Sequence, residues 1–232
     1  MVAPRQLPCL RVAWRPGGIS QLVLVVGAAM AMALAGCSGG KASPKQAGSQ
    51  SQPSEQVRSA SPSSTLPARW WQWAESVPSE SNPIDDATGR SCALNQPSDV
   101  WFLAGTHGGS ATRRCTVPVG RRIYFPVLNQ ICTVTPGETS AAAIRACSAT
   151  PDVARATLDG TPVHVATATS GSAFPFTARS DSSTGFSKGR HSVVAWGLWV
   201  GPLEISQGQH TLSFKGQAGT FTTSVTYHLT VR

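Results

Sequence analysis

The chain has 232 residues, of which 41% are hydrophobic, so it is long enough for one domain with tails and is not wholly disordered. Charged residues make up only 13%, about half the usual ~25% of soluble domains, and 22 Gly and 17 Pro argue against a helical bundle or coiled coil. The net charge of +8 falls to +3 over residues 66–232, which excludes the strongly basic surface typical of nucleic-acid-binding proteins.

Residues 1–36 predict an export signal. Three arginines and no acidic residue precede the uncharged apolar run at 22–36, and this run is shorter than the roughly 20 residues of a membrane-spanning helix. The run ends in Leu34-Ala35-Gly36 followed by Cys37, which resembles the lipobox of bacterial lipoproteins. The resemblance implies cleavage before Cys37 and a lipid on its thiol. An ordinary signal peptide followed by an incidental cysteine is the alternative.

The lipid would anchor the chain to the outer face of the cell membrane, or to the outer membrane in an organism that has one. Residues 37–65 predict a disordered tether, because they are rich in Ser, Pro and Gln and contain Val57 as the only large aliphatic residue. A tether of this length reaches on the order of 30 Å. We therefore expect residues 66–232 to form a folded domain that faces the extracytoplasmic space.

The first half of this domain predicts one helix and two strands. Residues 69–76 place Trp70 and Trp73 three positions apart on one helix face, which favours a core position for both. Trp71 points elsewhere and is the better candidate for a surface ring that binds sugars or another flat ligand. Residues 100–103 and 122–128 are strand candidates.

The second half predicts a further helix and several strands. The Ala-rich residues 138–147 favour a helix that starts near Thr135 or Gly137. The Asp159-Gly160 pair predicts a hairpin between strands 153–158 and 161–167.

The C-terminal strands are the clearest. Residues 193–200 are apolar on both parities, which predicts a central strand with Trp196 in the core and Trp199 under a loop or on a ligand face. Residues 210–215 and 220–231 alternate between apolar and polar, and the turn 216–219 would join them. Together the elements predict an all-β fold, a disulfide-stapled β-sandwich of immunoglobulin-like or jelly-roll type with one or two short helices.

Four cysteines belong to the folded domain, namely Cys92, Cys115, Cys132 and Cys147. An even number in an exported domain predicts two disulfides, for which three connectivities are possible. We favour Cys92–Cys115 with Cys132–Cys147, because loops between nearest neighbours close easily. A zinc site is the alternative, although the domain contains no CxxC pair. We expect no cofactor.

The domain also resembles an exported family of bacteria and fungi that has no established activity, and the resemblance implies an extracellular all-β protein. The matching residues are Trp71, Trp73, Asn82-Pro83, Asp86-Ala87-Thr88-Gly89, Cys92, Gln96, 100–106, Arg114, Cys115, Val117-Pro118, Gly120, Phe125-Pro126, Asn129, 208–211 and 225–229.

Several residues are candidates for a site, each with a structural alternative. His107, in a glycine-containing turn, is a candidate ligand or acid-base residue, or simply an exposed loop residue. Asp85 and Asp86 are weak calcium candidates, or turn-forming residues.

Four arginines flank Cys115 and the following turn, namely Arg113, Arg114, Arg121 and Arg122. They could bind carboxylates or phosphates, or form a solvated turn.

The sequence contains no His-Glu-x-x-His or phosphate-loop motif. We therefore expect a non-catalytic binding module for a cell-envelope glycan, an anionic polymer or another exported protein, and no nucleic-acid partner. Two alternatives stay open: an exported hydrolase that uses His107 or the Asp85/Asp86 pair, and a purely structural envelope protein.

Overall fold

The structure is a computed structural model, and it describes residues 65–182 and 184–232. The predicted export signal, the lipidated Cys37 and the tether lie outside the described residues. The elements are α1 (Thr65–Ser76), a short 3-10 helix η1 (Ser79–Ser81), β1 (Trp101–Phe102), β2 (Gly109–Val117), β3 (Ile123–Thr133), α2 (Ser140–Cys147), β4 (Val153–Leu158), β5 (Thr161–Val163), β6 (Ala166–Thr169), β7 (Phe174–Ala178), β8 (Gly189–Leu203), β9 (Gly208–Ala218) and β10 (Phe221–Val231).

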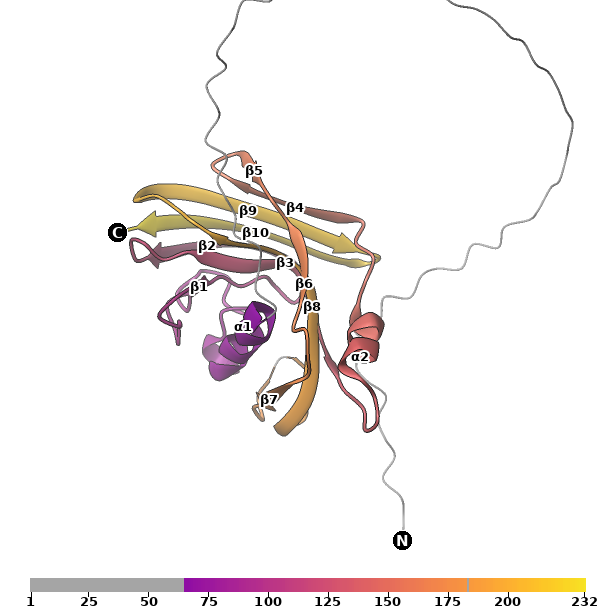
Figure 1. The fold of residues 1–232 in the computed structure, drawn as a ribbon. Coiled ribbons are helices and arrows are strands. Elements are labelled where there is room, and N and C mark those ends of the chain that lie inside the picture. The colour runs from indigo at the N-terminus through magenta and orange to yellow at the C-terminus, as the bar shows by residue number, and fades with distance from the viewer. Residues whose placement is uncertain (1–64, 183) are drawn as a thin grey trace, which may run out of the picture. The chain divides into compact units, whose positions relative to one another are not determined.

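The strands form two layered sheets, which confirms the predicted disulfide-containing β-sandwich with two short helices (Figure 1). The inner sheet has the order β1-β3-β8-β6, and β7 also pairs with β8. The outer sheet has the order β2-β10-β9-β4-β5. Each sheet contains one parallel pair, β1 with β3 and β2 with β10, and all other neighbours are antiparallel.

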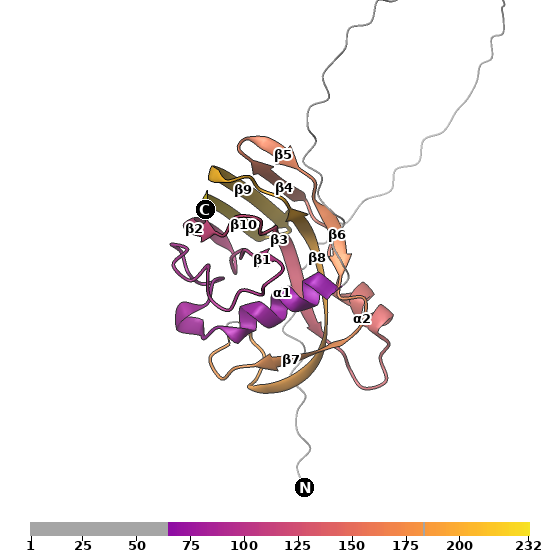
Figure 2. The same cartoon turned by 60° about the vertical axis from the view of Figure 1, so that its left-hand side comes forward.

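The inner sheet is covered on both faces. One face packs against the outer sheet, and α1 lies against β6, β7 and β8 on the other face (Figure 2). This double cover explains why residues 193–200 are apolar on both parities. Trp196 belongs to the core between the sheets, whereas Trp199 lies beneath α1, where it stacks on Tyr124 with ring centroids 5.1 Å apart.

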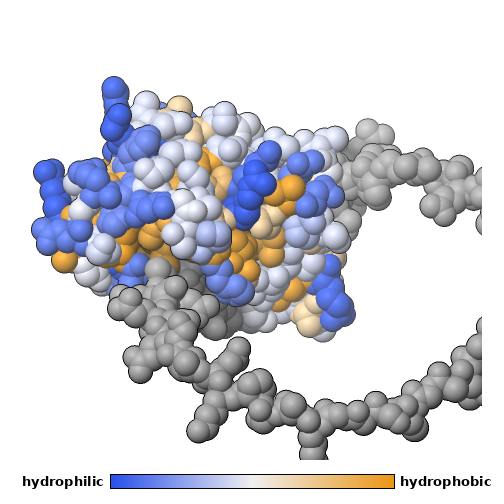
Figure 3. Space-filling model, turned by 90° about the horizontal axis from the view of Figure 1, so that it is seen from above, coloured by the Kyte–Doolittle hydropathy of each residue, from blue (hydrophilic) through white to orange (hydrophobic). Residues whose placement is uncertain are grey.

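The outer sheet has one buried and one exposed face. In β10 the buried residues are Val225, Tyr227, Leu229 and Val231, and polar residues alternate with them. Figure 3, a view from above, shows hydrophobic residues in a broken band among pale and blue ones, with blue residues gathered at the left end. The predicted strand at 220–231 is confirmed.

Both favoured disulfides are present. Cys92–Cys115 joins the segment before β1 to β2, and Cys132–Cys147 joins β3 to α2. They close loops with sequence separations of 23 and 15, so each contributes about 3 kcal/mol by restricting the unfolded chain. Two disulfides are typical of a domain that folds in an oxidising compartment. Within the described residues, no helix is long and apolar enough to cross a membrane.

Several predicted boundaries are wrong. The strand expected at 161–167 is divided, because β5 pairs with β4 in the outer sheet and β6 pairs with β8 in the inner sheet. The chain therefore changes layers at residues 164–165. Helix α2 begins after Thr139, rather than near Thr135 or Gly137, because the Thr139 hydroxyl accepts the N–H of Ala142 at 3.2 Å and caps the helix.

The turn between β9 and β10 is shorter than expected. Gly216 lies inside β9, which extends to Ala218. A Cβ at Gly216 would lie 2.5 Å from the Val127 carbonyl oxygen of β3. The close approach of β3 therefore explains this glycine. Strands β2 and β7 were not predicted.

Candidate ligand-binding pocket

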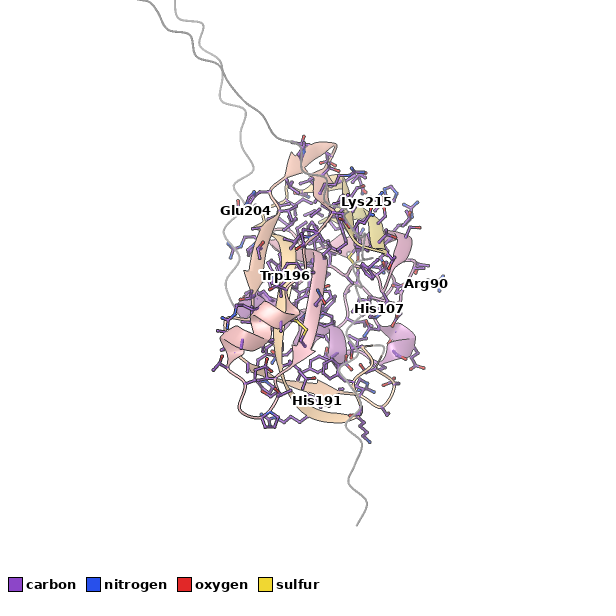
Figure 4. The ribbon with its side chains drawn as sticks, turned by 90° about the vertical axis from the view of Figure 1, so that its right-hand side faces the viewer. Arg90, His107, His191, Trp196, Glu204 and Lys215 are labelled. Carbon is purple, nitrogen blue, oxygen red and sulfur yellow. A yellow bond between two sulfur atoms is a disulfide. The ribbon has the colours of Figure 1, made fainter. Side chains whose placement is uncertain are left out.

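A pocket of about 160 Å³ lies beside residues 126–131 of β3. Its walls come from α1, residues 105–107, residues 126–131 of β3, Trp196 of β8 and the turn between β9 and β10. Figure 4 labels His107 and Trp196, which lie at about mid-height of the molecule in this view. We call this cavity the Trp71 pocket. Apart from His107, none of the described residues that line it carries an ionisable side chain.

A β-bulge in β3 shapes this wall. Pro126 is in register with Trp199 and Leu128 with Leu198, so Val127 is an extra residue without a partner. Val127 and Leu128 consequently both pack into the core between the sheets. A bulge bends its strand and increases the local twist. Residues 129–131 follow the bulge, are only partly buried and line the pocket.

Two buried hydrogen-bond donors in the pocket wall have no partner among the described residues. They are the indole Nε1 of Trp71 and the amide Nδ2 of Asn129. The other two tryptophans of α1 differ, because Trp70 donates to the Leu103 carbonyl at 2.9 Å and Trp73 to the Leu94 carbonyl at 2.8 Å. A buried donor without an acceptor costs about 1–3 kcal/mol. A ligand acceptor would recover that free energy if the wall opened enough to expose either nitrogen, since both atoms are buried.

Trp71 does not lie on the surface as expected. Only 6% of it is exposed, because its ring packs edge-on against Trp70 with centroids 5.1 Å apart. The expectation of an open aromatic platform is therefore wrong. As a candidate ligand-binding residue, Trp71 stays a prediction.

Arg113 is buried and fixes the loops that carry part of the pocket. Only 1% of it is exposed, and its guanidinium donates to four backbone carbonyls and to one hydroxyl group. The acceptors are the carbonyl oxygens of Ile84 (2.9 Å), Asp86 (2.6 Å), Ala104 (2.6 Å) and Gly105 (2.9 Å), and the hydroxyl oxygen of Tyr227 (2.9 Å). Arg113 thereby ties the loop of Asp85 to the loop of His107.

Tyr227 completes this buried network. Burial raises the pKa of the Tyr227 phenol, although the nearby Arg113 acts in the opposite direction. The phenol therefore keeps its proton and donates it to the Ala104 carbonyl at 3.0 Å, while the Ala104 N–H donates back at 3.1 Å. The start of the loop before β2 is thus held by Arg113 and Tyr227 together.

The four arginines do not form one exposed patch. Arg113 is buried, and Arg121 donates to the carbonyls of Pro97 and Val100, with its guanidinium 5.9 Å from the centre of the Trp101 ring. Arg114 and Arg122 are exposed. Only these two side chains of the four are oriented toward solvent, so the interpretation of a four-arginine anion site is wrong.

The structure brings His107 and Asp85 together at the edge of the pocket. The His107 Nε2 lies 3.7 Å from the Asp85 Oδ1, and both side chains are more than one-third exposed. Next to them, the Thr106 and Thr223 hydroxyls are 2.9 Å apart and also line the pocket. Sequence reasoning proposed His107 and Asp85 separately and gave no reason to pair them.

Asp86 has a structural role in its turn. Its carboxylate accepts the N–H groups of Thr88 and Ser91, each at 2.8 Å, and the Thr88 hydroxyl at 2.8 Å. Burial would raise the pKa of Asp86, but these hydrogen bonds outweigh burial and lower it below the ordinary value. The turn-forming alternative thus accounts for both oxygens. In the described part of the chain, no group of three or more His, Cys, Asp or Glu side chains could hold a metal ion.

Sequence reasoning missed Asn129 and Trp196 as pocket residues. Asn129 is the signal that could have been noticed, because it is a polar residue that directly follows the apolar strand at 122–128. Trp196 gave no such signal, because the sequence pattern of a central strand is the same whether or not its buried tryptophan borders a cavity. No protein-family model, curated protein or solved structure matches the chain.

Proposed function

We propose that this chain is an exported, lipid-anchored binding protein that holds one neutral, ring-shaped ligand in the Trp71 pocket. The observation that carries the proposal is an aromatic pocket whose wall contains two buried donors, Trp71 Nε1 and Asn129 Nδ2, without acceptors among the described residues. Binding pockets typically combine an apolar lining with a few polar groups that orient the ligand.

The size of the pocket limits the ligand to about one ring. A cavity of roughly 150 Å³ accommodates benzene, and the Trp71 pocket measures about 160 Å³. The rings of Trp70, Trp71, Trp196 and Phe221 supply broad apolar contact area. This volume has room for the body of one ring, whereas several consecutive rings do not fit.

The lining favours a neutral ligand. Burying an unpaired charge is costly, and no Lys, Arg, Asp or Glu is among the described residues that line the pocket. Two donors without acceptors select a ligand that offers oxygen acceptors, such as hydroxyl groups or the carbonyl of an acetamido group. Among the expected partners, an envelope glycan therefore suits this pocket, and an anionic polymer does not.

The cellular address in the proposal rests on the sequence. Support comes from the resemblance of Leu34-Ala35-Gly36-Cys37 to a lipobox and from the two disulfides of the folded domain. A lipid on Cys37 and a tether of residues 38–65 would hold the folded domain near the membrane surface, because the tether reaches on the order of 30 Å.

The test is a thermal-shift titration of the full chain with N-acetylglucosamine and glucose, and with glucuronate as a charged ring of similar size. A ligand at 100 times its Kd adds about 2.7 kcal/mol, which raises Tm by several degrees. We expect a shift with a neutral sugar and none with glucuronate. Trp71→Phe keeps a ring and removes the donor, so it should abolish most of the shift.

The control variant is Trp73→Phe, which removes an indole donor that is already paired with Leu94 and does not line the pocket. It should lower Tm without changing the ligand-induced shift. A flat response to every ring, or equal shifts in the Trp71 variant and the unaltered chain, would contradict the proposal.

A hydrolase is the second candidate, because His107 lines the pocket and faces Asp85. A histidine can act as a general base near neutral pH. The 3.7 Å separation exceeds a hydrogen bond, so the pair would have to tighten around a substrate. Time-dependent release of reducing sugar from a glycan, lost in His107→Ala, would favour this candidate over simple binding.

A further inference from the structure

The exposed face of the outer sheet carries basic residues in adjacent pairs. Arg155 of β4 is the register partner of Lys215 of β9, and Arg114 of β2 is the partner of His228 of β10. Register partners project from the same face of a sheet with Cβ atoms about 4.5–5.5 Å apart. The sheet thus places two pairs of basic side chains directly side by side.

Arg155 and Lys215 carry like charges opposite one another, which destabilises a sheet unless an anion lies between them. No acidic residue occurs at the outward positions of β2, β10, β9 and β4, and none of the four basic side chains forms an ion pair with another described residue. Two acids at the strand ends are already engaged. Asp159 accepts from His210 and from the Thr211 N–H, and Asp152 accepts the Gly219 N–H.

The two pairs are too far apart for one small anion. Lys215 is level with Ser224 of β10, which is level with Ser110 of β2, and Arg114 lies four residues further along β2. With strands about 4.8 Å apart and a rise of about 3.4 Å per residue, the pairs are separated by roughly 16 Å. A chain with repeated anionic groups can reach both pairs, and a single phosphate cannot.

Hydroxyl groups fill the surface between the pairs. Thr112, Thr226 and Ser213 form one row across three strands, and the Ser213 and Thr226 hydroxyls lie 3.2 Å apart. Such groups donate hydrogen bonds to phosphate oxygens. The same outward positions contain only one aliphatic side chain, Val153, so the face lacks the apolar residues with which a protein surface inserts into a bilayer.

We propose that the outer face of the outer sheet binds a linear, phosphate-bearing polymer through the pairs Arg155/Lys215 and Arg114/His228. This face is separate from the Trp71 pocket, since none of the four residues lines that pocket. Figure 4 shows Lys215 in the upper part of the molecule, above His107. The proposal places the anionic partner at a different site from the arginine-rich turn that the sequence indicated.

The test measures binding of the full chain to fluorescently labelled polyphosphate of about 45 units, with inorganic phosphate as the monomeric probe, at two salt concentrations. We expect saturable binding of the polymer that weakens as salt rises, and no saturable binding of inorganic phosphate at millimolar concentration. The double variant Arg155→Gln/Lys215→Gln should weaken polymer binding at least tenfold and reduce the salt slope by about 1.5.

The matched control is Arg122→Gln/Arg145→Gln, which removes two exposed arginines that are not part of β2, β10, β9 or β4 and makes the same change in net charge. It should weaken binding less than threefold. The Arg155/Lys215 variant relieves a like-charge pair, so its Tm should not fall, which separates lost binding from lost folding.

Three results would overturn the proposal. One is an equal loss of affinity in both double variants, which would mean attraction by net charge alone. Another is binding of inorganic phosphate as tight as that of the polymer. The third is saturable binding to vesicles of phosphatidylglycerol without binding to polyphosphate, which would assign the face to a lipid surface.

Discussion

Arg113 offers the sharpest test of how the fold builds the pocket wall. Its guanidinium is 1% exposed and holds five acceptors, four of which are carbonyl oxygens in two separate loops. Arg113→Ala removes all five donated hydrogen bonds at once. It also removes the link between the loop of Asp85 and the loop of His107, so pocket geometry and stability should change together.

The magnitude follows from the acceptors left behind. The Ala104 carbonyl and the Tyr227 hydroxyl keep another donor each, so three carbonyls lose theirs. A buried acceptor without a donor costs about 1–3 kcal/mol, which for three acceptors gives an upper bound near 9 kcal/mol. Water entering the space vacated by the side chain would satisfy some of them, and breaking a buried charged network typically costs 3–5 kcal/mol. We therefore expect a loss of about 4 kcal/mol, which corresponds to roughly 10 °C in Tm for a domain of this size.

Urea unfolding followed by tryptophan fluorescence measures this loss, and Arg114→Ala is the matched control. The two arginines are adjacent in β2, but Arg114 is exposed, so its removal should change the free energy of unfolding by less than about 0.5 kcal/mol. Where Arg113→Ala does not fold, Arg113→Lys keeps the charge with fewer donors and should lose about 2 kcal/mol. A loss below 1 kcal/mol in Arg113→Ala would refute the reasoning.

Two further predictions concern stability. Hydrogen bonds lower the pKa of Asp86 in the folded state, so the stability that its carboxylate contributes is present at neutral pH and is lost as the pH falls through that lowered pKa. Asp86→Asn should therefore have a lower free energy of unfolding than the unaltered chain at pH 7. In acid-unfolding curves this difference in stability should shrink below about pH 4. A constant difference down to about pH 2 would speak against this role of Asp86. Gly216→Ala places a Cβ 2.5 Å from the Val127 carbonyl oxygen and 2.5 Å from the Leu128 Cγ, and should lose about 2 kcal/mol in urea. The control is Gly105→Ala, because a Cβ at Gly105 meets nothing within 4 Å, and its free energy of unfolding should fall by less than about 0.5 kcal/mol. Similar losses of stability in the two variants would show that the close approach of β3 does not matter.

The elements that sequence reasoning predicted best are those whose burial has a simple period. The alternation at 220–231 and the continuous apolar run at 193–200 correspond to a half-buried and a fully buried strand. Strand β2 was missed because two adjacent arginines interrupt its pattern. Parity alone could have identified it, since Arg113 falls in step with the buried Cys115 and Val117.

The pocket depends on features that no local pattern reports. Val127 is an apolar residue in an apolar strand, and nothing in the sequence marks it as the bulged residue that leaves Asn129 beside a cavity. Trp70, Trp71 and Trp73 are equally apolar in sequence, and only the tertiary positions of Leu103 and Leu94 decide which indoles find acceptors. Parallel pairing of β2 with β10 is likewise a long-range property.

Strand β2 connects the two proposed sites through the alternation of its side chains. Arg113 points inward and holds the loops beside the Trp71 pocket, while Arg114, the next residue, points outward beside His228. Identical side chains thus receive opposite roles, because successive residues of a strand face opposite sides of the sheet. The proposed sites should consequently fail separately. Losing the Arg113 network should disturb the pocket wall, whereas losing Arg114 should weaken the polymer-binding face and leave the pocket intact.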